Sequence, residues 1–123
     1  MYIIKRIDTT ISDAKEYILN GGIIYTTESD RVVGKSTLID EIAKERKLPI
    51  VVRDNRQAIA REKEQFQEKY QSRKVFSVHE ISTIGLFGSR QAFLVDGINQ
   101  YELSRLQAIY GDKFSGFVQE DNF

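Results

Sequence analysis

The chain has 123 residues, 41% of them hydrophobic and 29% charged, with no cysteine and a formal net charge of zero. This length predicts one domain over residues 1–123, and the composition excludes disulfides, thiolate metal sites and any argument from overall charge for nucleic-acid binding. Every apolar run is too short for a membrane span and the first residues lack a signal-peptide core, so we expect a cytoplasmic protein.

The apolar pattern of the first half predicts two alternations of strand and helix. The expected segments are a short strand or arm at 2–7, a helix at 12–20, a strand at 23–27 and a helix at 35–46. Gly21 and Gly22 follow the first helix, and glycine commonly ends a helix. Pro49 prevents the second helix from continuing.

The second half continues the same alternation. The expected segments are a strand at 50–52, a charged helix at 55–71, strands at 75–78 and 92–96, a helix at 99–110 and a strand at 114–118. Ile59, Phe66 and Tyr70 form the expected apolar stripe of the charged helix. Repeated strand–helix–strand units predict an α/β fold: a three-layer α/β/α sandwich with a mostly parallel sheet.

A Gly-Lys-Ser-Thr run between the strand at 23–27 and the helix at 35–46 predicts a phosphate-binding loop. Loop amides and the helix N-terminus attract anions, Lys35 supplies a mobile charge, and the Ser36 hydroxyl can bind Mg²⁺. The residues expected to surround the phosphates are Ser29, Arg31, Val32, Val33, Gly34, Lys35, Ser36 and Thr37. Ser29 replaces the first glycine of the full pattern, so an alternative is an ordinary turn whose helix is capped by Ser36 or Thr37.

Asp96 is the predicted second ligand for Mg²⁺. Four apolar residues precede it, and ligands of open α/β sheets lie at the carboxyl ends of strands. An alternative is a simple Asp-Gly turn, with Asp96 hydrogen-bonding to the backbone after a buried strand.

Taken together, these segments resemble P-loop NTPases of the additional-strand, RecA-like kind, in particular the first lobe of helicases and phage terminase ATPases. The resemblance rests on RVVGKS at 31–36, VFSVHE at 75–80, AFLVD at 92–96 and FVQ at 117–119. It implies a P-loop NTPase-like fold, binding of ATP and Mg²⁺, hydrolysis of ATP, and a role in phage or mobile-element DNA metabolism.

The chain departs from that family at the position after the Mg²⁺-binding aspartate. The family usually has a glutamate there that polarises the attacking water, whereas this chain has Gly97. Glu80 and Gln119 are the candidates for that role, and Asp96 is counted with them as a catalytic residue because it would hold the metal. In helicases a second lobe supplies an arginine across the cleft, and such an arginine can raise the rate ~10³–10⁵-fold. The resemblance covers only the first lobe. We therefore expect a weak ATPase that needs a partner or an oligomer for turnover.

A different class of function is also compatible with these departures. The chain could be a degenerate RecA-like fold that serves as an inhibitory or adaptor module for a larger ATPase or a replication or packaging protein, without hydrolysis. The segment 56–74 is locally basic, which favours nucleic-acid contact, but its interleaved charges are more typical of a solvated helix face.

Overall fold

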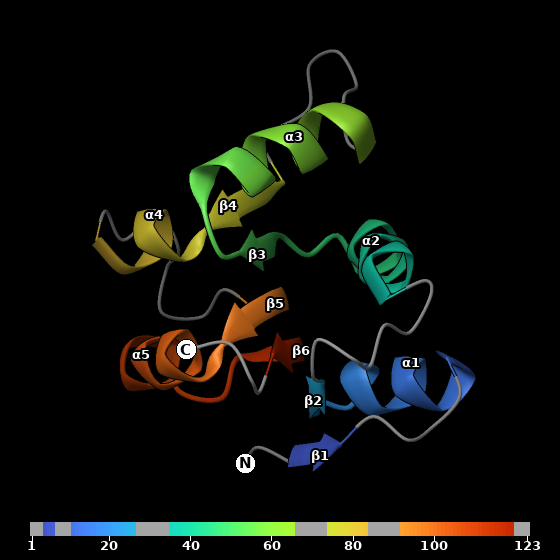
Figure 1. Ribbon diagram of the computed structural model, residues 1–123. Helices are drawn as coiled ribbons and strands as arrows, with labels where there is room; N and C mark the ends of the chain where they lie inside the picture. Colours follow the sequence, from blue (N-terminus) through green and yellow to red (C-terminus); the bar gives the residue numbers. More distant parts are fainter. Residues whose placement is uncertain (1–3, 7–10, 27–34, 66–73, 84–91, 120–123) are drawn as a thin grey trace.

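The computed structural model describes residues 4–6, 11–26, 35–65, 74–83 and 92–119 (Figure 1). Its strands are β1 (Ile4–Arg6), β2 (Ile23–Thr26), β3 (Ile50–Val52), β4 (Val75–Ser77), β5 (Phe93–Asn99) and β6 (Phe114–Gln119). Its helices are α1 (Ile11–Leu19), α2 (Lys35–Arg46), α3 (Asn55–Gln65), α4 (Val78–Thr83) and α5 (Gln100–Tyr110). The strands and helices follow the predicted order except for α4, which the sequence analysis did not predict.

The strands form one six-stranded sheet in the order β1-β2-β6-β5-β3-β4, and each neighbouring pair is parallel. The last strand, β6, is therefore inserted between β2 and β5. Because all these strands run in the same direction, their carboxyl ends share one edge of the sheet. Strand β2 leads to the predicted phosphate loop, and β5 carries Asp96. Only β6 lies between these two strands in the sheet.

Helices cover both faces of the sheet, as the predicted three-layer arrangement requires. One core cluster joins α1, α2 and Ala58 of α3 to the sheet, and the other joins α4 and α5 to its opposite face. Figure 1 shows α1 and α2 on one side of the strands and α4 and α5 on the other. Among the described helices, none is long and apolar enough to cross a membrane.

The apolar stripe predicted for the charged helix is wrong at Ile59. That side chain is 64% exposed, whereas its neighbour Ala58 is completely buried. The small side chain of Ala58 packs against the sheet at this point, and the larger Ile59 lies on the solvent side of the helix. The other predicted stripe residues, Phe66 and Tyr70, lie outside the described residues.

The strand predicted at 75–78 is one residue too long, because Val78 begins α4. The cause is a reciprocal pair of hydrogen bonds at the helix start. The Ser77 hydroxyl accepts the Glu80 N–H at 3.2 Å, and the Glu80 carboxylate accepts the Ser77 N–H at 3.1 Å. This is a capping box, which satisfies two amides that a new helix leaves without partners.

Candidate functional site

The predicted phosphate loop leads into α2, which begins at Lys35 as expected. Because Ser36 and Thr37 lie inside the first turn, neither occupies the capping position that the alternative assigned to them, whereas the turn itself falls outside the described residues. Both are exposed. Five of the predicted nucleotide contacts lie outside the described residues, as does the side chain of Lys35; the five are Ser29, Arg31, Val32, Val33 and Gly34.

The structure brings together the two residues predicted to hold Mg²⁺. The Ser36 hydroxyl donates a hydrogen bond of 2.8 Å to Oδ2 of Asp96, although the two residues are 60 positions apart in the chain. Asp96 is 9% exposed, and its partner comes from the exposed first turn of α2. A hydroxyl and a carboxylate thus lie side by side at a point that solvent can reach.

Asp96 does not end its strand, and the alternative of an Asp-Gly turn is also wrong. Strand β5 continues to Asn99, and its register with β6 shifts between Asp96 and Ile98. The intervening Gly97 has φ of +77°, a conformation that glycine adopts without steric cost. The result is a β-bulge, a device that redirects side chains near functional sites.

Arg61 of α3 is the central residue of the site, and the sequence did not single it out. Its Nε donates to Oδ1 of Asp40 and its Nη2 donates to the carbonyl of Ser36, each at 2.8 Å. Its Nη1 donates to Oδ2 of Asp96. The side chain is 12% exposed, so one guanidinium joins α2, α3 and β5 within a largely buried network.

Burial and the neighbouring charges together set the pKa of the Asp40 carboxyl. Burial raises the pKa of the Asp40 carboxyl, the positive charge of Arg61 opposes that rise, and the nearby negative charge of Asp96 adds to it. Two carboxylates therefore share one guanidinium. Two carboxylates and one guanidinium leave one negative charge in excess, so the group attracts a further cation more strongly than a single carboxylate–guanidinium pair would.

The sequence held a partial indication of Asp40 but none of Arg61. Asp40 follows Ser36 by four positions on α2, and residues with that spacing lie on the same helix face. Arg61 belongs to the locally basic stretch at 56–74 and looks like any other solvated arginine of that stretch. Only the packing of α3 against the sheet selects it from its neighbours.

The two candidates for polarising water lie in different places. The Glu80 carboxylate caps α4, which follows the edge strand β4. Gln119 is the last residue of β6 and is paired with Thr26 at the end of β2 and with Asn99 at the end of β5. Gln119 therefore lies on the same sheet edge as the predicted phosphate loop, while a catalytic role for either residue stays a prediction.

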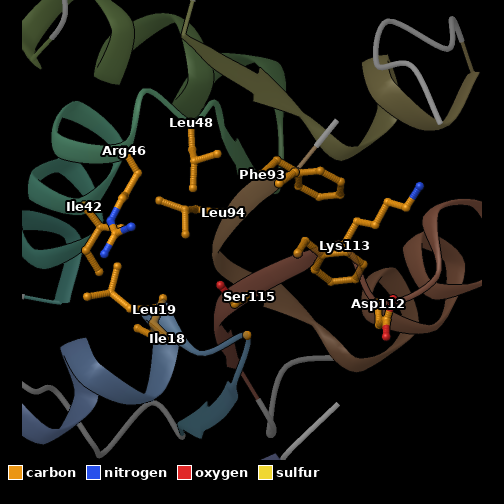
Figure 2. A pocket seen from close by; sticks show the side chains of 13 residues that line it. Ile18, Leu19, Ile42, Arg46, Leu48, Phe93, Leu94, Asp112, Lys113 and Ser115 are labelled. Carbon is orange, nitrogen blue, oxygen red and sulfur yellow. The ribbon is translucent and has the colours of Figure 1, made fainter. Parts of the chain in front are cut away.

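A separate pocket of about 440 Å³ opens at the other end of α2. Figure 2 shows the side chains of Ile18, Leu19, Ile42 and Arg46, from α1 and α2, on one side, and Phe93 on the other. None of the predicted site residues lines this pocket. Arg46 is ten residues beyond Ser36 on α2, which corresponds to about 15 Å along the helix, so the pocket is distinct from the Ser36–Asp96 site.

Two further findings bear on the site. Within the described residues, no group of three or more histidine, cysteine, aspartate or glutamate side chains could hold a metal ion. No protein-family model, curated protein or solved structure matches this chain. The geometry of Ser36, Asp96, Asp40 and Arg61 must therefore carry the functional argument alone.

Proposed function

We propose that this protein binds ATP and Mg²⁺ through a P-loop-like site and is a weak ATPase that needs a partner or an oligomer for turnover. The observation that carries the proposal is the 2.8 Å hydrogen bond between Ser36 and Asp96. The proposal requires these two residues to share one site, and nothing in the local sequence forces them together. Their contact supports the proposal because Mg²⁺ binding needs both residues at one place.

The donor atoms at this position suit Mg²⁺. This ion is hard, prefers oxygen ligands, keeps several waters, and is usually held by one or two protein carboxylates together with substrate phosphates. Ser36 and Asp96 supply a hydroxyl and a carboxylate, and the first turn of α2 supplies amides for phosphate oxygens. Bound Mg²⁺ would neutralise charge on the phosphates and polarise them toward attack.

The topology of the sheet supports a nucleotide site beside Ser36 and Asp96. Helix α2 follows β2 onto one face of the sheet, whereas α5 follows β5 onto the opposite face. Ligands of open parallel sheets bind at the carboxyl edge, where successive connections diverge in this way. Ser36 and Asp96 lie where the connections from β2 and β5 separate.

For hydrolysis, we assign the positioning of water to Gln119 in preference to Glu80. The register places Gln119 beside Thr26 at the start of the loop, whereas Glu80 is engaged in the cap of α4. We expect Gln119→Ala to lower ATP turnover strongly. Glu80→Gln should leave turnover close to wild type, and the reverse order would reassign the role.

The proposal is tested by calorimetric titration with a non-hydrolysable ATP analogue and Mg²⁺. Wild-type protein should bind the nucleotide, and Lys35→Ala and Asp96→Ala should each lose most of that affinity, because one removes the mobile phosphate charge and the other a metal ligand. Lys63→Ala, on the exposed surface of α3, is the matched control. Absence of wild-type binding at millimolar nucleotide would refute the proposal.

A second candidate function is an inhibitory or adaptor module for a larger ATPase or a replication or packaging protein. It is favoured by Tyr101 and Ile109 on α5, which are 67% and 48% exposed. Exposed large apolar side chains are typical anchors of protein interfaces. This candidate predicts that Tyr101→Ala weakens the complex with such a partner in a pull-down assay, whereas Lys35→Ala does not.

A further inference from the structure

The positively charged guanidinium of Arg61 contacts Asp96, which is a proposed ligand of Mg²⁺. Oδ2 of Asp96 accepts a hydrogen bond from Ser36 and another from Nη1 of Arg61. The same oxygen therefore serves the hydroxyl that would bind the metal and a cation that belongs to the protein. A divalent cation that bound Oδ2 of Asp96 would compete with this guanidinium for the same oxygen.

We infer that Arg61 is a built-in competitor for the divalent cation: it neutralises Asp96 in the cation-free protein and releases Oδ2 when the cation binds. This inference rests on the proposed function, because it concerns the same pair of residues. It adds a determinant of cation affinity that lies outside the phosphate loop.

The contacts of Arg61 make such a release feasible without unfolding. Its Nε and Nη2 both lie 2.8 Å from Oδ1 of Asp40, and its Nη2 also donates to the carbonyl of Ser36. These contacts do not involve Asp96, so the Arg61 side chain stays bound to α2 when the hydrogen bond from Nη1 to Asp96 breaks. The planar guanidinium presents separate N–H groups to the two carboxylates, so Nη1 can leave Asp96 while Nε stays on Asp40.

The charges around Arg61 determine whether loss of its guanidinium strengthens or weakens the binding of a divalent cation. Asp40 and Asp96 have 11% and 8% of their side-chain surface exposed, and Arg61 contacts both. Removing the guanidinium leaves two carboxylates close together in a poorly solvated place, which favours a divalent cation. Arg61→Gln should therefore bind a divalent cation more tightly than wild type even when no nucleotide is present.

The experiment is a titration with Mn²⁺ alone, followed by the electron paramagnetic resonance signal of the free ion. Wild type, Arg61→Gln and the double variant Arg61→Gln/Asp96→Asn are compared. We expect about tenfold tighter binding to Arg61→Gln, a change worth ~1.4 kcal/mol, and loss of that gain in the double variant. Arg53→Gln is the control, because Arg53 is an arginine that pairs with Glu102, at 3.2 Å.

Equal or weaker Mn²⁺ binding by a folded Arg61→Gln, or a gain that survives Asp96→Asn, would overturn the inference. If that variant does not fold, the side-chain nitrogen resonances of Arg61 in the wild type decide in a titration with diamagnetic Mg²⁺, because they must shift as the cation saturates its site. Unchanged resonances at saturation would overturn the inference as well. Since no nucleotide is used, a failure of ATP binding in the earlier titration is a separate result.

Discussion

Replacing Gly116 with alanine should destabilise the sheet at the point where β6 passes beside β5. Gly116 has φ of +138°, and a Cβ added there would lie 2.0 Å from the carbonyl oxygen of Val95. The obstructing atom belongs to the backbone of β5, so no side-chain rotation relieves the clash. The strands would have to separate next to Asp96, which follows Val95 in the chain.

Two contributions set the magnitude. Holding an alanine in a backbone conformation suited to glycine costs about 1–3 kcal/mol. Overpacking a close contact in a well-packed interior costs about 1–3 kcal/mol more. The expected loss for Gly116→Ala is therefore about 2–6 kcal/mol, a large share of the ~5–15 kcal/mol that stabilises a typical domain.

Urea unfolding measures this loss, and Gly97→Ala is the matched control. Gly97 also has a positive φ, of +77°, but an added Cβ there would meet nothing within 4 Å. Its replacement should show the backbone cost alone, about 1–3 kcal/mol. Equal losses in the two variants would refute the argument that β6 needs glycine at position 116 because of the close approach of β5.

Three further predictions concern α5 and are checked by urea unfolding. Asn99→Ala should lose about 1 kcal/mol, because its side chain accepts the Glu102 N–H at 2.8 Å in a capping box; an unchanged midpoint would contradict this. Leu106→Ala, at a fully buried position, should lose about 2–5 kcal/mol, whereas Ile109→Ala, at a half-exposed one, should change stability by less than ~1 kcal/mol. Burial raises the pKa of Tyr110 above its ordinary value of 10.0, so the folded state keeps a proton that the unfolded state releases, and stability should fall as pH rises above 10. Tyr110→Phe should show a smaller loss between pH 9 and pH 11, and an identical loss would contradict the assignment.

Local patterns in the sequence predicted the order of the strands and of the longer helices because that order depends on short-range periodicity, whereas the six-residue helix α4 was missed. The helix at Lys35–Arg46 and the strand at Ile50–Val52 have the predicted bounds. Both segments are continuous runs with clear ends, and the second is fully buried. The parallel sheet with helices on both faces follows from repeated strand–helix–strand connections of sufficient length.

The parts that escaped prediction depend on contacts between distant segments. The bulge at Gly97 arises from pairing with β6, which follows later in the chain, so an Asp-Gly pair alone resembles a turn. The place of Arg61 depends on how α3 packs over Asp40 and Asp96, and no short pattern distinguishes it from the neighbouring basic residues. The pair Ser36–Asp96 could be anticipated because carboxyl ends of parallel strands share one edge.

The central claim is that Ser36 and Asp96 together hold Mg²⁺ beside a bound nucleotide. It is tested most directly by calorimetric titration of a non-hydrolysable ATP analogue with Mg²⁺ and again with EDTA, for wild type, Ser36→Ala and Ser104→Ala. Ser104 is an exposed serine of α5 whose hydroxyl donates to a carbonyl within that helix. We predict that Mg²⁺ tightens nucleotide binding in wild type and Ser104→Ala but not in Ser36→Ala. A Mg²⁺ effect that persists in full in Ser36→Ala, or that is absent from the wild type, would contradict the claim.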